Sequence, residues 1–370
     1  MPVAADRCQP PDYPAPPRRL HGETTMRRGI PRVAVVGAGI TGASVAWHLA
    51  RAGAAVTVFE RSATASSGAT GGSYGWVGTG SMLPSDALPR FALIRDALPE
   101  FARLSRELGP LPIAARGAVV WSGTDADTDA FVAEQQGAGI GIDRLDRART
   151  MALEPHLNAP ALAAWLPGDF ALEPDLLTAQ LLSAAQASGA RVGFNQEVLA
   201  IETRHGRVTA VATPHGSHAV DAVVLANAAS AIPLAARFDI DLPVHEAPAV
   251  LMAFDALPGC LHHLLCAADL ELRPRLGGGL LLAADMPIEG ETGLDSLARQ
   301  CLADTQALFK IPAGLALRSA RAVQRPMTAD SMPVRGFLPG VDGLYAAIAH
   351  PGVMLAPWLG RLAAQDIVAA

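Results

Sequence analysis

The stretch that most constrains this chain is residues 32–49, where an apolar run meets a glycine-rich turn and then an apolar helix-forming segment. Gly37, Gly39 and Gly42 have the spacing of a dinucleotide-binding fingerprint. The first glycine permits a sharp turn, the second lets a pyrophosphate approach the backbone, and the third lets the helix pack closely on the strand. Free N–H groups at the start of such a helix favour a negative charge. The stretch therefore predicts the first strand, turn and helix of a nucleotide-binding fold.

The segment after this helix strengthens the prediction. A second apolar run, residues 54–59, ends at Glu60, which lies eighteen positions after Gly42 and is placed to accept the hydroxyls of an adenosine ribose. Residues 61–76 are rich in glycine and small side chains and show no regular apolar period. Such a segment is either a flexible linker or a surface of hydroxyls and bare N–H groups for an elongated ligand. Its position directly after Glu60 favours the ligand.

Composition excludes several classes of protein. The chain of 370 residues is 50% hydrophobic and 17% charged, which indicates a globular fold large enough for two lobes. A net charge of −6, with no basic cluster beside aromatic residues, argues against a nucleic-acid partner. Four cysteines are too few for a disulfide scaffold, and the Cys260–Cys266 run with its two histidines matches no zinc spacing, so we expect no metal site.

The N-terminal residues contain many prolines and arginines but no apolar segment of the length that a signal peptide needs. We therefore expect residues 1–30 to be a disordered tail. No apolar run is long enough to predict a membrane-spanning helix. The expected location is the cytoplasm.

The remaining chain alternates between helical and strand-like patterns. An amphipathic helix is predicted over residues 85–108, because apolar residues recur there at helical spacing. The turn His205-Gly206 predicts a hairpin between short strands. Further predicted elements are strands at 116–121, 191–194, 197–202, 207–212, 219–225 and 343–348, helices near 125–136, 143–152, 174–185 and 292–309, and a last helix beginning near 352.

Taken together, these pieces resemble the flavin-dependent amine-oxidising family that includes D-amino-acid oxidase, glycine oxidase and monomeric sarcosine oxidase. The resemblance covers about residues 31–369. The early matches are the glycine turn, Glu60 and the small-residue segment 65–72. The later matches are residues 172–175, 197–198 and 226–229, the arginine–proline segment 325–336, and the C-terminal turn 343–357. Order and spacing make the set specific to the family.

The resemblance implies an α/β fold in which a glutathione-reductase-like FAD-binding Rossmann lobe carries an inserted antiparallel β-rich substrate lobe. Residues 31–85, 150–240 and 326–370 are expected to form the FAD-binding domain, and residues 86–149 and 241–325 the substrate-binding domain.

The implied cofactor is non-covalent FAD. Sequence alone favours FAD over NAD as well, because one glycine fingerprint is paired with a distant strand–turn–helix near Gly352. No cysteine lies beyond Cys301 and no histidine lies between His48 and His156, which removes the usual anchors of a covalent flavin. The residues expected to contact FAD are Gly37, Gly39, Ile40, Thr41, Gly42, Glu60, Arg61, Ser67, Ala69, Gly71, Gly72, Val198, Ala226, Ala228, Gly352, Val353 and Met354.

The resemblance also implies the substrate contacts. In relatives, an arginine at the position of Arg325 holds the substrate carboxylate, for which a guanidinium is suited; the alternative is a solvated arginine at a strand end. His350 falls near the flavin and is a candidate catalytic residue, or else a packed histidine in a turn. Tyr74 and Arg273 are candidates for the wall of the substrate pocket, or else structural residues.

Three departures from the family pattern qualify this. Ala228 stands where relatives have glycine, so the backbone there is expected to lie differently beside FAD. The C-terminal turn carries no second arginine, which makes glycine a doubtful substrate. The chain's single lysine, Lys310, lies in an expected surface helix, so the lysine that activates oxygen in sarcosine oxidases has no counterpart, and this weakens an oxidase relative to a dehydrogenase.

The predicted function is oxidation of the C–N bond of a small amino acid or secondary amine by hydride transfer to flavin N5, giving an imine that hydrolyses. The acceptor of the electrons is either oxygen or an electron carrier, and an oligomer is possible. The alternatives are a dehydrogenase that passes electrons to a quinone or carrier, and a non-catalytic FAD-binding subunit.

Overall fold

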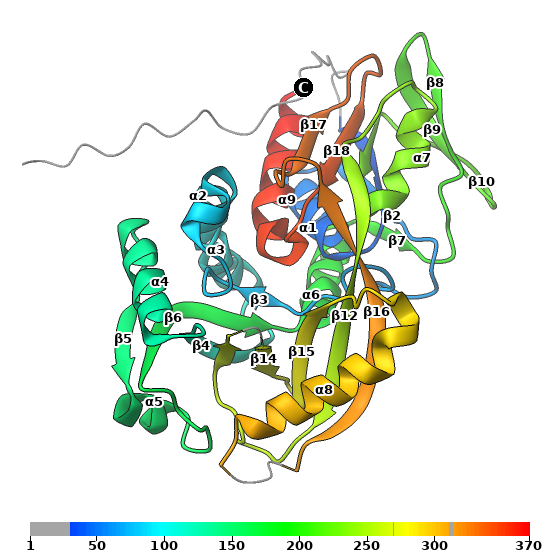
Figure 1. Ribbon diagram of the computed structural model, residues 1–370. Coiled ribbons are helices and arrows are strands. Elements are labelled where there is room, and N and C mark those ends of the chain that lie inside the picture. The colour runs from blue at the N-terminus through cyan, green and yellow to red at the C-terminus, as the bar shows by residue number, and fades with distance from the viewer. Residues whose placement is uncertain (1–29, 269, 311–313) are drawn as a thin grey trace, which may run out of the picture.

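The computed structural model describes residues 30–268, 270–310 and 314–370, and nearly all of the predicted N-terminal tail lies outside them. Two β-sheets organise these residues (Figure 1). One is a mostly parallel sheet flanked by helices, and the other is a larger, mainly antiparallel sheet built from inserted segments. This confirms the predicted α/β class with a Rossmann-like core.

The six-stranded sheet has the order β17-β18-β11-β1-β2-β7, and all its neighbours are parallel except β17 and β18. Its central strand β1 is an apolar run buried between layers, as a parallel strand covered on both faces must be. Val36 at the end of β1 pairs with both Phe59 and Leu225, so these carboxyl ends meet at one edge. The strands are β1 (Arg32–Val36), β2 (Ala55–Phe59), β7 (Arg191–Gly193), β11 (Ala222–Leu225), β17 (Val334–Phe337) and β18 (Leu344–Ile348).

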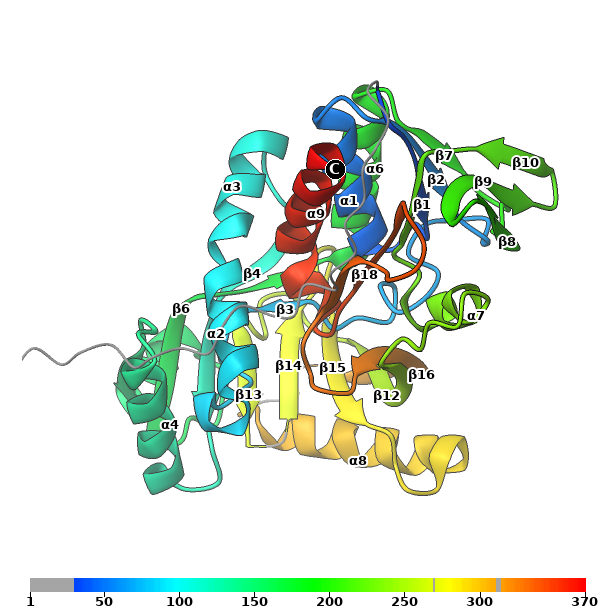
Figure 2. The ribbon, with the colours of Figure 1, turned by 90° about the horizontal axis from the view of Figure 1, so that it is seen from above.

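Helices α1 (Ile40–Arg51), α6 (Pro174–Ala187) and α9 (Gly352–Ala369) pack on one face of this sheet (Figure 2). A three-stranded meander, β8 (Ala200–Arg204), β9 (Arg207–Thr213) and β10 (Gly216–Ala219), covers the other face together with α7 (Ile232–Ala236). The predicted hairpin turn is confirmed, since His205 and Gly206 take left-handed φ values of 53° and 75° between β8 and β9.

The second sheet has nine strands, in the order β16-β12-β15-β14-β13-β4-β6-β3, with β5 paired to β6. Helix α8 (Leu294–Ala307) packs on one of its faces, and the other face turns toward the first lobe (Figure 1). The strands are β3 (Trp76–Val77), β4 (Ile113–Trp121), β5 (Asp143–Asp146), β6 (Leu162–Leu172), β12 (Val244–Asp255), β13 (Leu264–Ala267), β14 (Leu270–Pro274), β15 (Leu280–Asp285) and β16 (Ala316–Thr328). The remaining helices are α2 (Leu88–Ala97), α3 (Pro99–Leu108), α4 (Asp125–Gly137), α5 (Arg147–Leu153) and the short 3₁₀ turns η1 (Pro84–Asp86), η2 (Ala228–Ala231) and η3 (Gly290–Gly293).

The structure differs from the sequence predictions at several elements. The single helix predicted over 85–108 is divided into α2 and α3, because Pro99 starts a new helix. The helix predicted over 143–152 begins only at Arg147, where the Asp146 side chain caps it by accepting from the Arg149 amide. Lys310 lies beyond the end of α8 and donates to the Pro155 carbonyl.

The lobe boundaries also differ from the expected ones. Helices α2 and α3, which were expected in the substrate domain, contribute Ile94 and Leu104 to the same core as α1 and α9. Strand β6, expected in the FAD-binding domain, belongs to the nine-stranded sheet. Each element joins the lobe in which its apolar face is buried. The position of an element along the chain does not show which lobe that is.

Candidate cofactor and substrate site

A cavity of about 900 Å³ opens at the carboxyl end of the parallel strands, between the two sheets. Segments far apart in the chain line it, including the glycine turn, the small-residue segment, the end of β16 and the C-terminal turn. All the predicted cofactor residues line it except Gly42 and Gly71. A Cβ at Gly42 would lie 2.0 Å from the Gly37 carbonyl oxygen, so this glycine allows α1 to pack on the turn, as predicted.

The first end of the cavity is formed by the N-terminus of α1. Glu60 accepts a hydrogen bond from the Ala38 amide at 2.7 Å and one from the Ser62 amide at 2.9 Å, which fixes its carboxylate beside the turn. The Thr70 hydroxyl accepts from the Ile40 amide at 3.0 Å. No side chain caps the helix at Gly39, and its first turn contains no acidic residue. This end of the cavity is therefore suited to an anion.

Sequence analysis did not select Thr70 as a site residue. A Cβ at Gly39 would lie 2.9 Å from the Thr70 hydroxyl oxygen, so the glycine turn and the small-residue segment touch. The only sequence signal for this contact is a hydroxyl residue within a glycine-rich segment.

Ala228 holds the backbone in the left-handed region, with a φ of 56°. The conformation is one that glycine adopts freely and alanine only at a cost. Ala228 therefore keeps a backbone conformation of the kind that glycine adopts freely. That the backbone lies differently beside FAD than in relatives stays a prediction. Beside Ala228, Asn227 lines the same cavity, and its buried Oδ1 accepts no hydrogen bond from any described residue.

The second end of the cavity is formed by the N-terminus of α9. Gly352, Val353 and Met354 line the cavity, and Pro351 at the N-cap supplies no side-chain hydrogen bond. The helix begins at Gly352, as predicted. Two helix N-termini whose N-cap residues supply no side-chain hydrogen bond thus face one cavity, and both favour negative charge there, although the Thr70 hydroxyl already accepts from the Ile40 amide of α1.

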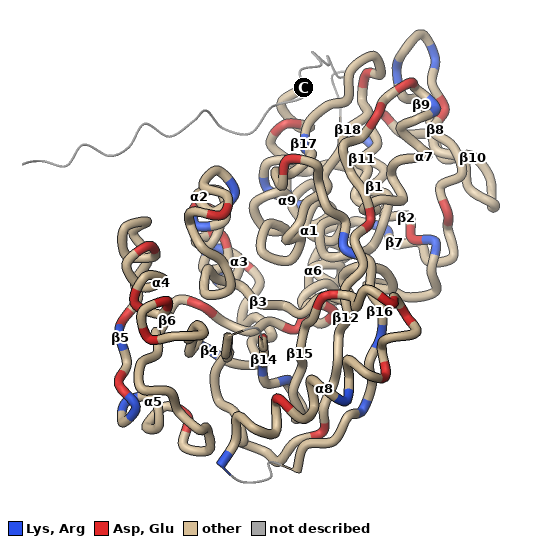
Figure 3. Tube along the Cα trace, in the orientation of Figure 1, with Lys and Arg blue, Asp and Glu red and all other residues tan. Residues whose placement is uncertain are grey.

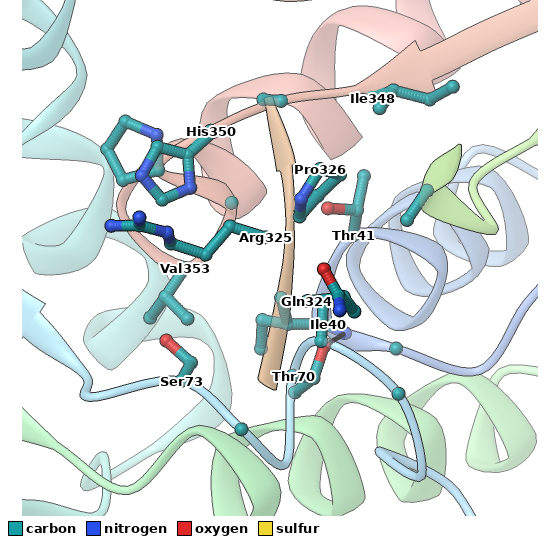
Figure 4. Close-up of a pocket in the computed structure, with 18 of the residues that line it drawn as sticks. Ile40, Thr41, Thr70, Ser73, Gln324, Arg325, Pro326, Ile348, His350 and Val353 are labelled. Atoms are coloured by element: carbon teal, nitrogen blue, oxygen red, sulfur yellow. Dashed lines mark hydrogen bonds between the residues drawn. The ribbon is translucent and has the colours of Figure 1, made fainter. Parts of the chain in front are cut away.

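Arg325 lies near the end of β16 and reaches toward the cavity beside His350 (Figure 4). Its Nη2 donates to Asp285 Oδ1 and to the Pro248 carbonyl oxygen, both at 3.2 Å. Its buried Nε has no partner among the described residues. The guanidinium is therefore anchored on one edge and still has a donor to offer.

A second arginine, Arg90 of α2, lies in the same region. No hydrogen bond or ion pair joins it to a described residue, its Nε is buried without a partner, and burial lowers its pKa. Burial, together with the positive charges of Arg90 and Arg325, lowers the pKa of His350 to about 4. His350 is therefore neutral near pH 7. Part of the decrease in its pKa comes from the positive charges of Arg90 and Arg325. Sequence analysis missed Arg90, because no motif marks an arginine beside the apolar stripe of a helix.

Comparison of the sequence with models of known protein families shows which family this chain belongs to. A family model described as FAD dependent oxidoreductase matches residues 32–366. The chain belongs to this family. It is thus an FAD-dependent enzyme, which agrees with the predicted cofactor and fold.

The relatives of this flavoenzyme act on amino acids. A glycine oxidase from Geobacillus kaustophilus is 27% identical over 355 residues, which cover 90% of this chain and 92% of the relative. A D-amino acid dehydrogenase from Cereibacter sphaeroides is 25% identical over 382 residues, covering 86% and 87%. The crystal structure of glycine oxidase from Geobacillus kaustophilus superposes with a TM-score of 0.77 at 26% identity, covering 92% of this chain and 95% of that one.

The cavity fits FAD on its own evidence. The glycine turn and Glu60 suit the adenosine and pyrophosphate, and the N-terminus of α9 suits the part of the flavin ring that becomes negative on reduction. The small residues at 37, 39 and 72 leave bare backbone, since an added Cβ would meet neighbours at 2.6–3.0 Å.

The other residues predicted to contact substrate are divided. Tyr74 lines the cavity, and no described residue forms a hydrogen bond with its buried hydroxyl. Arg273 does not line it: its side chain is 0% exposed and is ion-paired with Glu173 at 3.1 Å. Arg273 was predicted to line the substrate pocket, but its side chain instead forms a buried ion pair with Glu173.

Charges elsewhere are mixed, since acidic and basic residues are interspersed over the described elements of the flavoenzyme (Figure 3). Within the same residues, no group of three or more histidine, cysteine or acidic side chains could hold a metal ion. A search of the described helices for one long and apolar enough to span a bilayer finds none.

Proposed function

We propose that this flavoenzyme oxidises the C–N bond of an amino acid or secondary amine whose carboxylate is held by Arg325 and Arg90. The observation that carries the proposal is the pair of arginines beside His350, each with a buried Nε that has no partner within the described part of the chain. Arg90 has no counter-ion among the described residues, and Arg325 is ion-paired only through Nη2 with Asp285 at 3.2 Å, so a carboxylate ligand would offset the cost of burying these two guanidinium groups. Arg90 thereby supplies, from α2, the second arginine that the C-terminal turn lacks.

FAD held by the glycine turn, Glu60 and the N-terminus of α9 would supply the hydride acceptor of the reaction. In the substrate, the Cα–H bond breaks with its electron pair and the nitrogen lone pair forms the C=N bond. The resulting iminium ion loses its N–H proton to water, and water hydrolyses the released imine to a carbonyl compound and ammonia, or to a carbonyl compound and a primary amine where the substrate is a secondary amine. The residues of the chain orient the substrate, and no strong base is required of them.

The positive potential around His350 also acts on the amine. The two arginines that disfavour protonation of His350 disfavour the ammonium form of a nearby substrate in the same way. They favour the neutral amine, whose lone pair the oxidation requires. Neutral His350 can donate or accept one hydrogen bond at this position, so its proposed role is to contact substrate or flavin without acting as an acid.

The experiment is anaerobic reduction of the flavin by a panel of D- and L-amino acids, sarcosine, proline and glycine, followed at the flavin absorbance. Bleaching by at least one amino acid is expected, and no bleaching by any of them would contradict the proposal. With that substrate, we expect Arg325→Ala and Arg90→Ala each to lower kcat/KM by at least about tenfold. The matched control is Arg318→Ala, since Arg318 is an exposed arginine on the same strand, 65% exposed, and does not line the cavity.

The acceptor of the electrons is either oxygen or an electron carrier. The chain's single lysine, Lys310, donates to the Pro155 carbonyl and does not line the cavity, which favours an electron carrier over oxygen. Stopped-flow mixing of reduced enzyme with aerated buffer tests this. Slow reoxidation together with rapid reoxidation by a quinone identifies a dehydrogenase, and rapid reoxidation in air identifies an oxidase.

A further inference from the structure

Glu271 of β14 is a cavity residue that neither the family resemblance nor the proposed chemistry uses. Strand register shows which way it points. Leu272 pairs with Leu282, and both belong to the core under α8. Glu271 pairs with Ala283, which pairs with Leu251, and these positions therefore lie on the opposite face. Glu271, Ala283 and Leu251 all line the cavity, so the carboxyl group lies on its wall.

The charge of this carboxyl group is not balanced by the described protein. No hydrogen bond or ion pair joins Glu271 to another described residue. The cation two positions along the same strand, Arg273, is paired with Glu173. The other acid on this face, Asp285, is paired with Arg325 at 3.2 Å. Burial, together with the negative charge of Asp285, raises the pKa of Glu271 to about 7.

A polar but unpartnered group lies beside Glu271. Tyr74 lines the same cavity, packs against the apolar cluster that contains Leu251, and has a buried hydroxyl with no partner among the residues that the structure describes. The carboxylate and the phenol interact electrostatically. An ionised carboxylate and a phenol oxygen that both face a cavity form an acceptor site for a cation with N–H donors. The fold keeps such a partly buried acid without a counter-ion at a cost, which a cationic ligand removes.

The position of Glu271 relative to Arg325 defines the size of the ligand. The two residues are separated by three strand spacings and about four residues along the strands, which is roughly 20 Å between Cα atoms. Both residues lie on the same face of the sheet and line the same cavity. A carboxylate at Arg325 therefore cannot place an α-ammonium, one carbon away, at Glu271. A group at the far end of an extended side chain can reach it.

We propose that Glu271, with the Tyr74 hydroxyl, forms a subsite for a second, cationic group of the substrate, so that the enzyme selects amino acids with a basic side chain. The proposal rests on the proposed function, because it takes Arg325 as the carboxylate contact. The proposed subsite means that the cavity carries opposite charges at two places. The cationic arginines lie at the end formed by α2 and the C-terminal turn, and the acid Glu271 lies on the wall formed by β14. A small substrate such as glycine would leave the subsite empty.

The test compares substrates of equal length that differ only in the distal charge. Lysine and ornithine, in both enantiomers, are compared with norleucine and norvaline as reductants of the enzyme-bound flavin. We expect kcat/KM for the basic amino acid to exceed that of its neutral counterpart by at least about tenfold. Glu271→Gln should remove most of this preference and change kcat/KM for the neutral substrate by less than about threefold.

Two controls make the result decisive. Glu246→Gln neutralises an exposed acid on β12 that does not line the cavity, and it should leave the preference intact. Glu271→Lys should reverse the preference toward glutamate, with the flavin spectrum reporting that the holoenzyme has folded. Equal rates for basic and neutral substrates in the wild type, or equal losses for both in Glu271→Gln, would overturn the subsite. Failure of every amino acid to reduce the flavin would instead overturn the proposed function, so the two failures are distinguishable.

Discussion

The ion pair between Arg273 and Glu173 offers a direct test of whether Arg273 serves substrate or structure. Arg273 donates from Nη1 and Nη2 to the two Glu173 oxygens, at 3.1 Å each, from Nε to the Tyr74 carbonyl, and from Nη1 to the Pro274 carbonyl at 3.0 Å. Glu173 also accepts from the Leu276 amide at 2.9 Å. Every oxygen of the pair is satisfied within the protein, and none is directed at the large cavity.

The perturbation is Arg273→Met, which keeps the apolar volume and removes the charge. The remaining Glu173 carboxylate is only 10% exposed, and an acid stranded in this way typically costs about 3–5 kcal/mol of the free energy of unfolding. In the double variant Arg273→Met/Glu173→Leu no charge is left without a partner, so we expect it to recover most of that loss.

The pH dependence has a defined sign. Burial raises the pKa of Glu173, but the hydrogen bonds and charge of Arg273 lower it by more, so its pKa in the folded protein lies below the ordinary value. The stability from this pair is therefore complete above the unfolded-state pKa and is lost as pH falls through the lower folded-state pKa.

The assay is urea unfolding of the three proteins, followed by flavin fluorescence and circular dichroism, together with kcat/KM of the folded holoenzymes. We expect a lower midpoint for Arg273→Met and kcat/KM within about threefold of the wild type. An unchanged midpoint combined with a loss of kcat/KM larger than about tenfold would refute the structural interpretation and restore Arg273 as a substrate contact.

Three further outcomes are expected. Ala228→Gly should raise the free energy of unfolding by about 0.5–1 kcal/mol, because it relieves a left-handed alanine; an unchanged or lower melting temperature would show that the alanine is unstrained. Glu60→Ala should weaken FAD binding by at least about tenfold in fluorescence titrations, since it removes the acceptor at the Ala38 amide; Glu197→Ala, on the same cavity wall, is the comparison. The wild type should lose stability as pH falls from about 6.5 toward 4, because buried His350 resists protonation, and His350→Gln should lose less over that range.

Much of the fold was predictable because its signals are local. The glycine turn, the apolar strands of the parallel sheet and the proline-started helix α6 each depend on residues close together in sequence. The assignment of α2, α3 and β6 to lobes was not predictable in this way, because it depends on which apolar face meets which distant partner. Pro99 was a visible signal for the break between α2 and α3, but the apolar period continues across it.

The site residues also differ in how far the sequence predicts them. The cofactor residues lie in motifs whose backbone geometry is set locally, and the structure places 15 of the 17 on one cavity, apart from Gly42 and Gly71. The residues that distinguish substrates are isolated side chains on separate elements. Arg90 and Glu271 belong to no motif, and Arg273 has the sequence context of a pocket residue while its side chain points into a buried pair.

The missing arginine of the C-terminal turn illustrates what this means for substrate choice. From the sequence, its absence pointed away from glycine because a carboxylate contact was lost. In the structure Arg90 supplies a guanidinium from α2, so the carboxylate site of the cavity need not be weaker than that of a relative with two arginines. What changes is the remainder of the pocket, where the uncompensated Glu271 stands across the cavity from the arginines. A substrate without a distal charge leaves that acid unpaired, and one with a distal cation pairs it. On the proposed subsite, we therefore expect glycine to be disfavoured because it cannot reach Glu271, and not because the C-terminal turn lacks an arginine.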